Sequence, residues 1–145
     1  MYYIICKVDV PGFHNWPDAP AELAYLRSVH RHVFGITAKI PVTHDDRDLE
    51  IIQTQNRIHH FLSDRFGDEN GHIAFGSMSC EMIAKLIADT FGCAEVTVQE
   101  DGQGGGVYAS SARNLTTTSS SRKATSSLTS ASPQNTSFRI PAFSL

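Results

Sequence analysis

The sequence is organised around residues 26–40, which read LRSVHRHVFGITAKI. The β-branched and aromatic residues that follow His30 and His32 predict a strand over residues 32–42. Alternate side chains of a strand share a face, so the two histidines can present their imidazoles together. Imidazole is a common zinc ligand, and a catalytic zinc typically takes three protein ligands and leaves one position open. His14 is the best candidate for the third ligand, although an HxH pair also arises by chance in a chain with seven histidines.

The composition limits the classes of protein to which the chain can belong. Its 145 residues suffice for one domain with its own core. The net charge of −3 and the pI of about 6.1 indicate no basic surface for nucleic acid. The apolar runs are too short to cross a membrane and no signal-peptide pattern is present, which favours a cytoplasmic protein with no membrane partner. The three cysteines (Cys6, Cys80 and Cys93) are widely spaced and predict no disulfide framework.

The hydrophobic patterning predicts an α+β domain. We expect the order strand, strand, helix, helix, strand, strand, which favours an antiparallel sheet covered on one face by two helices. In the first half we expect a strand at 2–10 ended by Pro11-Gly12, a short helix or loop at 20–28, the HxH strand, and a helix that is opened by the acids at 45–48 and ends near Arg65. A loop at 67–71 then leads to a helix that is capped by Ser77 or Ser79 and stopped by Gly92. The remaining expected segments are a strand at 96–100, a turn-rich connection at 101–106 and a last strand beginning at Val107.

The C-terminal part differs in composition from the rest. Residues 109–145 contain eleven serines, six threonines and no acidic residue. A segment with so few large apolar side chains cannot bury enough surface to offset the entropy lost on ordering. The sequence therefore predicts a domain at 1–108 and a disordered Ser/Thr-rich tail at 109–145.

Four segments in order indicate a family. His14-Asn15-Trp16-Pro17 is followed sixteen residues later by His30-Arg31-His32-Val33-Phe34, then by a helix start at Ser79-Cys80-Glu81 and a strand from Val96 to Glu100. Over residues 1–108 this combination resembles the 6-pyruvoyltetrahydropterin synthase family, which includes the bacterial 6-carboxytetrahydropterin synthases.

The resemblance implies a ββααββ tunnelling fold, whose sheets associate edge to edge into a homo-oligomeric ring with active sites between subunits. It implies a zinc ion held by His14, His30 and His32, and a pterin ring anchored by Glu100. The implied activity is that of a zinc-dependent lyase. It would act on 7,8-dihydroneopterin triphosphate with loss of triphosphate, within tetrahydrobiopterin, folate-like or queuosine (7-deazaguanine) precursor metabolism. A carboxylate suits the anchor role because it can accept two hydrogen bonds from the pterin amino and ring N–H groups. Without the resemblance, Glu100 would be interpreted as a solvated residue at a strand end.

The chain departs from the family pattern at the catalytic base. The family cysteine lies four residues before the HxH pair, where this chain has Leu26. The family also has an Asp-His pair at the end of the first helix. The nearest match here is Ile58-His59-His60-Phe61, which has isoleucine in place of the aspartate and a shorter spacing. His59 or His60 could take this role, and His59 is the candidate catalytic residue, although an ordinary histidine on a helix surface is the favoured interpretation of either.

Two residues of the second helix are further candidates. Cys80 could replace the missing base, because a helix N-terminus lowers the pKa of a thiol, or it could be a small buried residue of the first turn. Glu81 matches a recurrent family glutamate and is a candidate substrate contact, or a first-turn acid that complements the helix dipole.

Three alternatives to the family activity stay open. The chain could use the same fold and metal with a different base. It could be a catalytically inactive zinc-containing oligomer that binds a pterin or purine. It could also hold a structural zinc closed by a fourth protein ligand such as His44.

Overall fold

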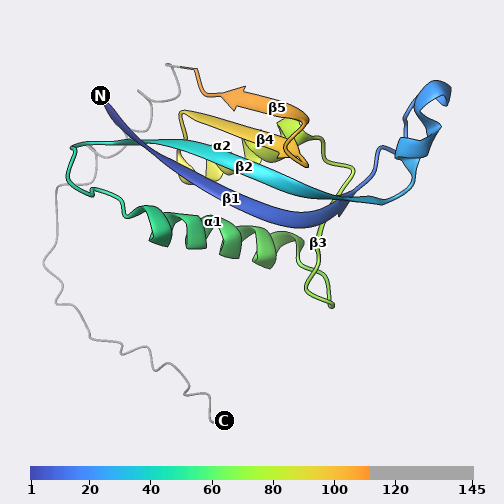
Figure 1. Ribbon diagram of the computed structural model, residues 1–145, viewed down its shortest axis with the longest axis horizontal. Coiled ribbons are helices and arrows are strands. Elements are labelled where there is room, and N and C mark those ends of the chain that lie inside the picture. Colours follow the sequence, from blue (N-terminus) through green and yellow to red (C-terminus); the bar gives the residue numbers. More distant parts are fainter. Residues whose placement is uncertain (112–145) are drawn as a thin grey trace, which may run out of the picture. The chain divides into compact units, whose positions relative to one another are not determined.

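The computed structural model describes residues 1–111, which form a five-stranded sheet with two α-helices and one 3-10 helix (Figure 1). The strand order is β3-β1-β2-β4-β5. The elements are β1 (Tyr2–His14), η1 (Ala21–Arg27), β2 (His30–Val42), α1 (Ile51–Phe66), β3 (Ile73–Gly76), α2 (Cys80–Phe91), β4 (Glu95–Glu100) and β5 (Gly104–Ala109). The α+β class is confirmed.

The two longest strands, β1 and β2, pair antiparallel along their whole length, from Tyr2 opposite Val42 to His14 opposite His30. The predicted break at Pro11-Gly12 is wrong, because β1 continues through both residues. β3 pairs with β1 only at the positions after Pro11, so the missing N–H of the proline can be accommodated at an edge. This continuation brings His14 to the same end of the ribbon as the HxH pair.

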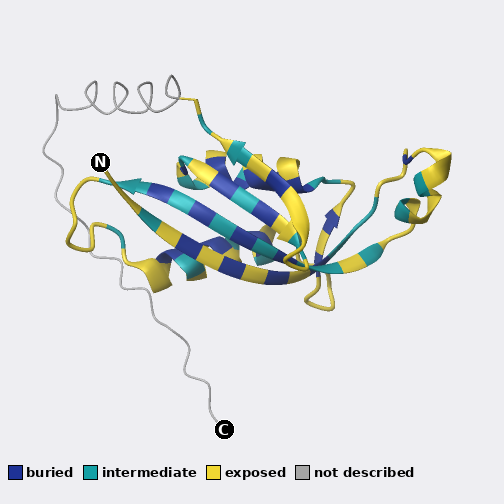
Figure 2. Ribbon diagram, turned by 45° about the horizontal axis from the view of Figure 1, so that its top comes forward, coloured by how far each residue is buried: buried dark blue, intermediate teal, exposed yellow. Residues whose placement is uncertain are grey.

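Both helices pack on one face of the sheet. The buried side chains of β1, β2 and β4 alternate with exposed or half-buried ones, as the striped strands in Figure 2 show. Those on the inner face form a single cluster with the buried residues of α1 and α2, among them Phe34, Ile58 and Ile83. Two helices on one face were predicted, and the single shared core confirms this arrangement.

The sheet is mixed, which corrects the prediction of a purely antiparallel one. β1, β2, β4 and β5 are antiparallel neighbours, whereas β3 runs parallel to β1. The sequence did not indicate β3, which is only four residues long and contains Ala74 and Gly76. The backbone N–H of Asn15 donates a 2.9 Å hydrogen bond to the carbonyl of Gly76, the last residue of β3. This bond holds the segment before α2 beside the end of β1.

The first α-helix begins later than predicted. Glu50 caps it by accepting hydrogen bonds from the backbone N–H groups of Ile52 and Gln53. The acids at 45–48 lie in the preceding loop, where Asp48 accepts hydrogen bonds from the backbone N–H and the hydroxyl of Thr43. The buried side chains of α1 are Thr54, Ile58 and Leu62.

The second α-helix has the predicted termini. The Ser79 hydroxyl accepts a hydrogen bond from the backbone N–H of Met82, and Gly92 ends the helix in the left-handed conformation. Of the two serines considered, Ser79 is the cap.

The last strand begins at Gly104, so the predicted turn-rich connection at 101–106 is half strand. Position 105 of this strand requires glycine, because a side chain there would collide with the backbone of Val98 and Gln99 on β4. Ala109 completes β5, one residue beyond the predicted domain end. The prediction of a disordered tail otherwise falls mainly on residues 112–145, which lie outside the described part of the chain. Among the described residues, neither α-helix has the length and apolarity needed to cross a bilayer.

Candidate metal centre

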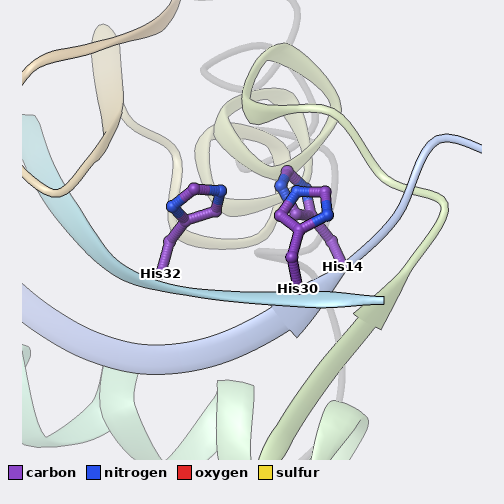
Figure 3. A group of neighbouring side chains, drawn as sticks. All are labelled: His14, His30 and His32. Atoms are coloured by element: carbon purple, nitrogen blue, oxygen red, sulfur yellow. The ribbon is translucent and has the colours of Figure 1, made fainter. Parts of the chain in front are cut away.

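Three imidazoles converge at one end of the β1–β2 ribbon. His14 pairs with His30 across the ribbon, and His32 lies two residues further along β2, so all three side chains share the face that carries the helices. Figure 3 shows the three rings rising together from the same side of the ribbon. One ring nitrogen from each histidine lies within 4.8 Å of the others. The HxH pair and the third histidine that were predicted to act together are therefore neighbours, and the cluster could hold a metal ion.

Each ring is oriented by an oxygen atom at Nδ1. The acceptors are the Met78 carbonyl for His14 at 3.1 Å, the Ser28 carbonyl for His30 at 2.8 Å and the Asp101 carboxylate for His32 at 2.7 Å. Carbonyl and carboxylate oxygens only accept, so the proton lies on Nδ1 in all three rings. Nε2 is then the nitrogen available to a metal, as in most histidine metal sites with an oriented outer shell.

A carboxylate faces two of these nitrogens. Glu100, the last residue of β4, places Oε1 3.1 Å from His14 Nε2 and Oε2 3.4 Å from His32 Nε2. An anionic carboxylate beside the lone pairs of two neutral imidazoles is repelled unless positive charge lies between them. Protons or a bound cation supply such charge. The donor set therefore fits a divalent cation with three nitrogen ligands and a carboxylate within reach.

A pocket of about 440 Å³ adjoins the histidines. This volume falls within the usual range for small-molecule sites. Its apolar surface includes Trp16, in the loop after β1, and Leu26 of η1, and its polar groups include residues at the start of α2 and the end of β4. Its lining residues are His14, Asn15, Trp16, Leu26, His30, Met78, Ser79, Cys80, Glu81, Glu100, Gly104 and Gly105.

The predicted substrate-binding residues, Glu100 and Glu81, both line this pocket. Glu100 reaches it from β4, and Glu81 from the first turn of α2. Leu26, the residue at the position of the family cysteine, also lines the pocket. Three segments that are far apart in the sequence thus meet at one cavity.

Cys80 lies at the site as a small buried residue of the first turn of α2, which is one of its two predicted interpretations, and not as a substitute base. Burial, and after it the nearby Glu100 carboxylate, together raise the pKa of its thiol to about 12. The Cys80 Sγ lies 3.5 Å from Glu100 Oε1, to which the thiol donates. The expected lowering of the pKa by the helix N-terminus is therefore wrong, because desolvation and a like charge outweigh the dipole. In this arrangement Cys80 supports Glu100 and does not supply a thiolate.

Two other histidines considered from the sequence lie elsewhere. The structure leaves His59 exposed on α1, and His59 does not line the pocket. His44 lies in the loop after β2, beyond the opposite end of a thirteen-residue strand, at roughly 40 Å from His30 on strand geometry. His44 is thus too distant to close the coordination of the three-histidine cluster.

Sequence reasoning missed Asp101. This residue begins the β4–β5 turn with a positive φ of 54°. Its carboxylate accepts hydrogen bonds from the backbone N–H of Val33 and from His32, and these contacts lower its pKa from the ordinary value. An acid directly after Glu100 and before Gly102 was the available signal, but it was interpreted only as a turn.

Comparison with known proteins adds no family name to this geometry. A scan against protein-family models finds no match, and a search of curated proteins finds no significant match.

Proposed function

We propose that the chain is a zinc-dependent lyase that acts on a reduced pterin of the 7,8-dihydroneopterin triphosphate type. The observation that supports this most strongly is the convergence of three oriented imidazoles beside a pocket that contains a carboxylate. Three histidines with one further position open to substrate are a common ligand set for catalytic zinc. The pocket volume also suits a ligand of pterin size.

The residues divide the work between metal and substrate. His14, His30 and His32 would hold the zinc through Nε2. Zinc bound there supplies Lewis acidity to substrate oxygens and acidifies neighbouring protons. Glu100 would accept hydrogen bonds from the amino and ring N–H groups of the pterin and so orient it. Cys80 would keep the Glu100 carboxylate in place through its hydrogen bond, and Glu81 would provide a second polar contact at the start of α2.

The proposal includes the tunnelling fold and its ring assembly. β1, β2, β4 and β5 form an antiparallel set, with α1 and α2 between β2 and β4 in the chain, which supports a ββααββ core with β3 added at the β1 edge. β5 is the other edge strand of this sheet and would pair with a second subunit. We expect a homo-oligomer in which a neighbouring subunit contributes to the pocket, and light scattering would give its mass.

A second candidate function is binding without turnover, by an inactive zinc-containing oligomer that captures a pterin or purine. Leu26 has no proton to exchange, and the raised pKa of Cys80 keeps that thiol protonated at neutral pH. If His14 and His30 hold the zinc, the side chains of the pocket lining that remain able to accept a proton are the carboxylates of Glu100 and Glu81. This scarcity of bases favours the second candidate.

The deciding experiment measures pterin binding and triphosphate release by the zinc-loaded full chain. For the lyase, we expect release by the wild type, loss of binding and release in Glu100→Ala, and unchanged zinc content in that variant. Glu95→Ala is the matched control, because Glu95 is an exposed acid at the opposite end of β4. Release that persists in Glu100→Ala would contradict the anchor role. Tight binding without release would select the second candidate, and neither binding nor release would exclude both.

The variant Leu26→Cys tests whether the family chemistry is dormant. A thiol at this position of the pocket would restore the usual proton-transfer group, so triphosphate release should increase. No increase would indicate that the remainder of the pocket has diverged as well.

A further inference from the structure

Asp101 is joined to β2 by three hydrogen bonds, although it lies beyond the last residue pair of the β2–β4 ladder. That last pair is Phe34 with Glu100. Past it, the Asp101 backbone N–H donates to the Val33 carbonyl at 2.9 Å, and Oδ1 accepts from the Val33 N–H at 2.8 Å. Oδ2 accepts from His32 Nδ1 at 2.7 Å. One side chain thus ties the turn, the end of the strand and an imidazole together.

The His32 contact differs in kind from those of the other two histidines. His14 and His30 donate to backbone carbonyls, which no substitution removes. His32 donates to an anionic side chain, and a carboxylate at Nδ1 fixes the tautomer and makes Nε2 a stronger electron donor. Its ring also has the longer contact to Glu100, 3.4 Å against 3.1 Å for His14, so Asp101 provides its shorter anchor.

We propose that Asp101 is a positioning residue that fixes the orientation of His32 and thereby sets the affinity of the three-histidine centre for a divalent cation. The inference rests on the proposed metal centre but not on its substrate. Asp101 does not line the pocket, so it acts on the metal through His32 and has no direct contact with a ligand there.

A purely structural role for Asp101, in the turn, makes a different prediction and can be separated from this one. Asp101→Gly removes the carboxylate but relieves the positive φ and keeps the backbone hydrogen bond to the Val33 carbonyl, so the turn should still form. Asp101→Asn tolerates the same backbone and keeps one acceptor oxygen, which cannot serve both Val33 and His32 fully. If Asp101 were only a turn residue, neither variant would change metal affinity.

Asp68→Asn provides a matched control. Asp68 is also an exposed loop carboxylate that accepts backbone N–H groups, and it lies 3.5 Å from the Nδ1 of His72. His72 is not part of the three-histidine cluster. Asp68→Asn should therefore leave the affinity for zinc unchanged.

The experiment measures zinc affinity by competition with a chelating dye, together with the visible absorption spectrum of the cobalt-substituted full chain and the melting temperature. We expect Asp101→Gly to weaken zinc binding by about 10–100-fold and to alter the cobalt spectrum, with Asp101→Asn in between. The metal-free glycine variant should still unfold in a cooperative transition, which shows that the fold itself is retained. Wild-type zinc affinity in both variants would overturn the proposal and leave the metal centre intact. Absence of zinc binding by the wild type would overturn the positioning role and the metal centre together. Neither result depends on pterin turnover.

Discussion

The two ends of the β1–β2 ribbon carry the same kinds of side chains but differ in what they can bind. At one end, His32 meets Asp101 at 2.7 Å and is joined by two more imidazoles and Glu100. At the other end, His44 stands 3.8 Å from Asp48 in an exposed loop, with its side chain 53% exposed. A histidine beside an aspartate becomes a candidate site only where strand register brings further donors to the same face. The spacing of a histidine and an aspartate in the sequence does not show whether such further donors are present.

The largest effect should come from removing a ligand at the first end. His30→Ala, like His14→Ala and His32→Ala, should reduce the zinc content from about one per chain to nearly none, because two imidazoles hold the ion much more weakly than three. His44→Ala should leave the zinc content unchanged. Metal analysis of the purified chains gives the comparison directly. Full zinc in the His30 variant would mean that the ion binds elsewhere.

A second prediction concerns the packing that holds the metal end together. Gly105→Ala forces a methyl group against the backbone of Val98 and Gln99 and should destabilise the fold by at least about 2 kcal/mol. Gly104→Ala is the control, because a methyl group there meets nothing within 4 Å. Urea unfolding of the two variants provides the measurement. Equal stabilities would show that β5 can shift away from β4 without loss.

The smallest effect should appear at the His44 end on acidification. The hydrogen bonds from Thr43 lower the pKa of Asp48, so this carboxyl contributes stability above its ordinary pKa of about 3.9 and loses that contribution as the pH falls towards the lower folded value. The melting temperature of the wild type should therefore fall more steeply below about pH 4 than that of Asp48→Asn. Zinc binding at neutral pH should be the same in both. Parallel acid profiles would show that the Thr43 contacts are too weak to matter.

Much of the fold was predictable because it depends on local periodicity. The alternation along β2 and the spacing of Ile83 and Ile87 in α2 each indicate one buried face, and Ser79 and Gly92 mark the ends of α2. The errors occurred where local rules compete with pairing to distant residues. Pro11 and Gly105 resemble breaks in a strand, yet pairing with β2 and β4 keeps them in the sheet. The acids before α1 resemble a helix start, but Asp48 closes the preceding loop.

The site shows the same division. The three histidines and Glu100 could be chosen from the sequence because the spacing of an HxH pair and the four ordered segments are visible there. That His59 lies outside the site could not be predicted from the sequence. A shift of one position on α1 decides whether a side chain meets the core or the solvent. The raised pKa of Cys80 depends on its burial and on a carboxylate twenty residues away, and neither is a property of the helix start alone.

The unequal lengths of the strands have a consequence for local opening. β2 is paired with β4 only from Phe34 to Lys39, so His30 and His32 lie on a part of the ribbon that extends past the ladder. Backbone amides in such an overhang ordinarily exchange with solvent through fraying of the strand end. A cation bound by His14 on one strand and by His30 and His32 on the other would have to be released before the two strands could separate there. Metal supply would then govern how often this end of the sheet opens, and tighter binding would make the opening rarer.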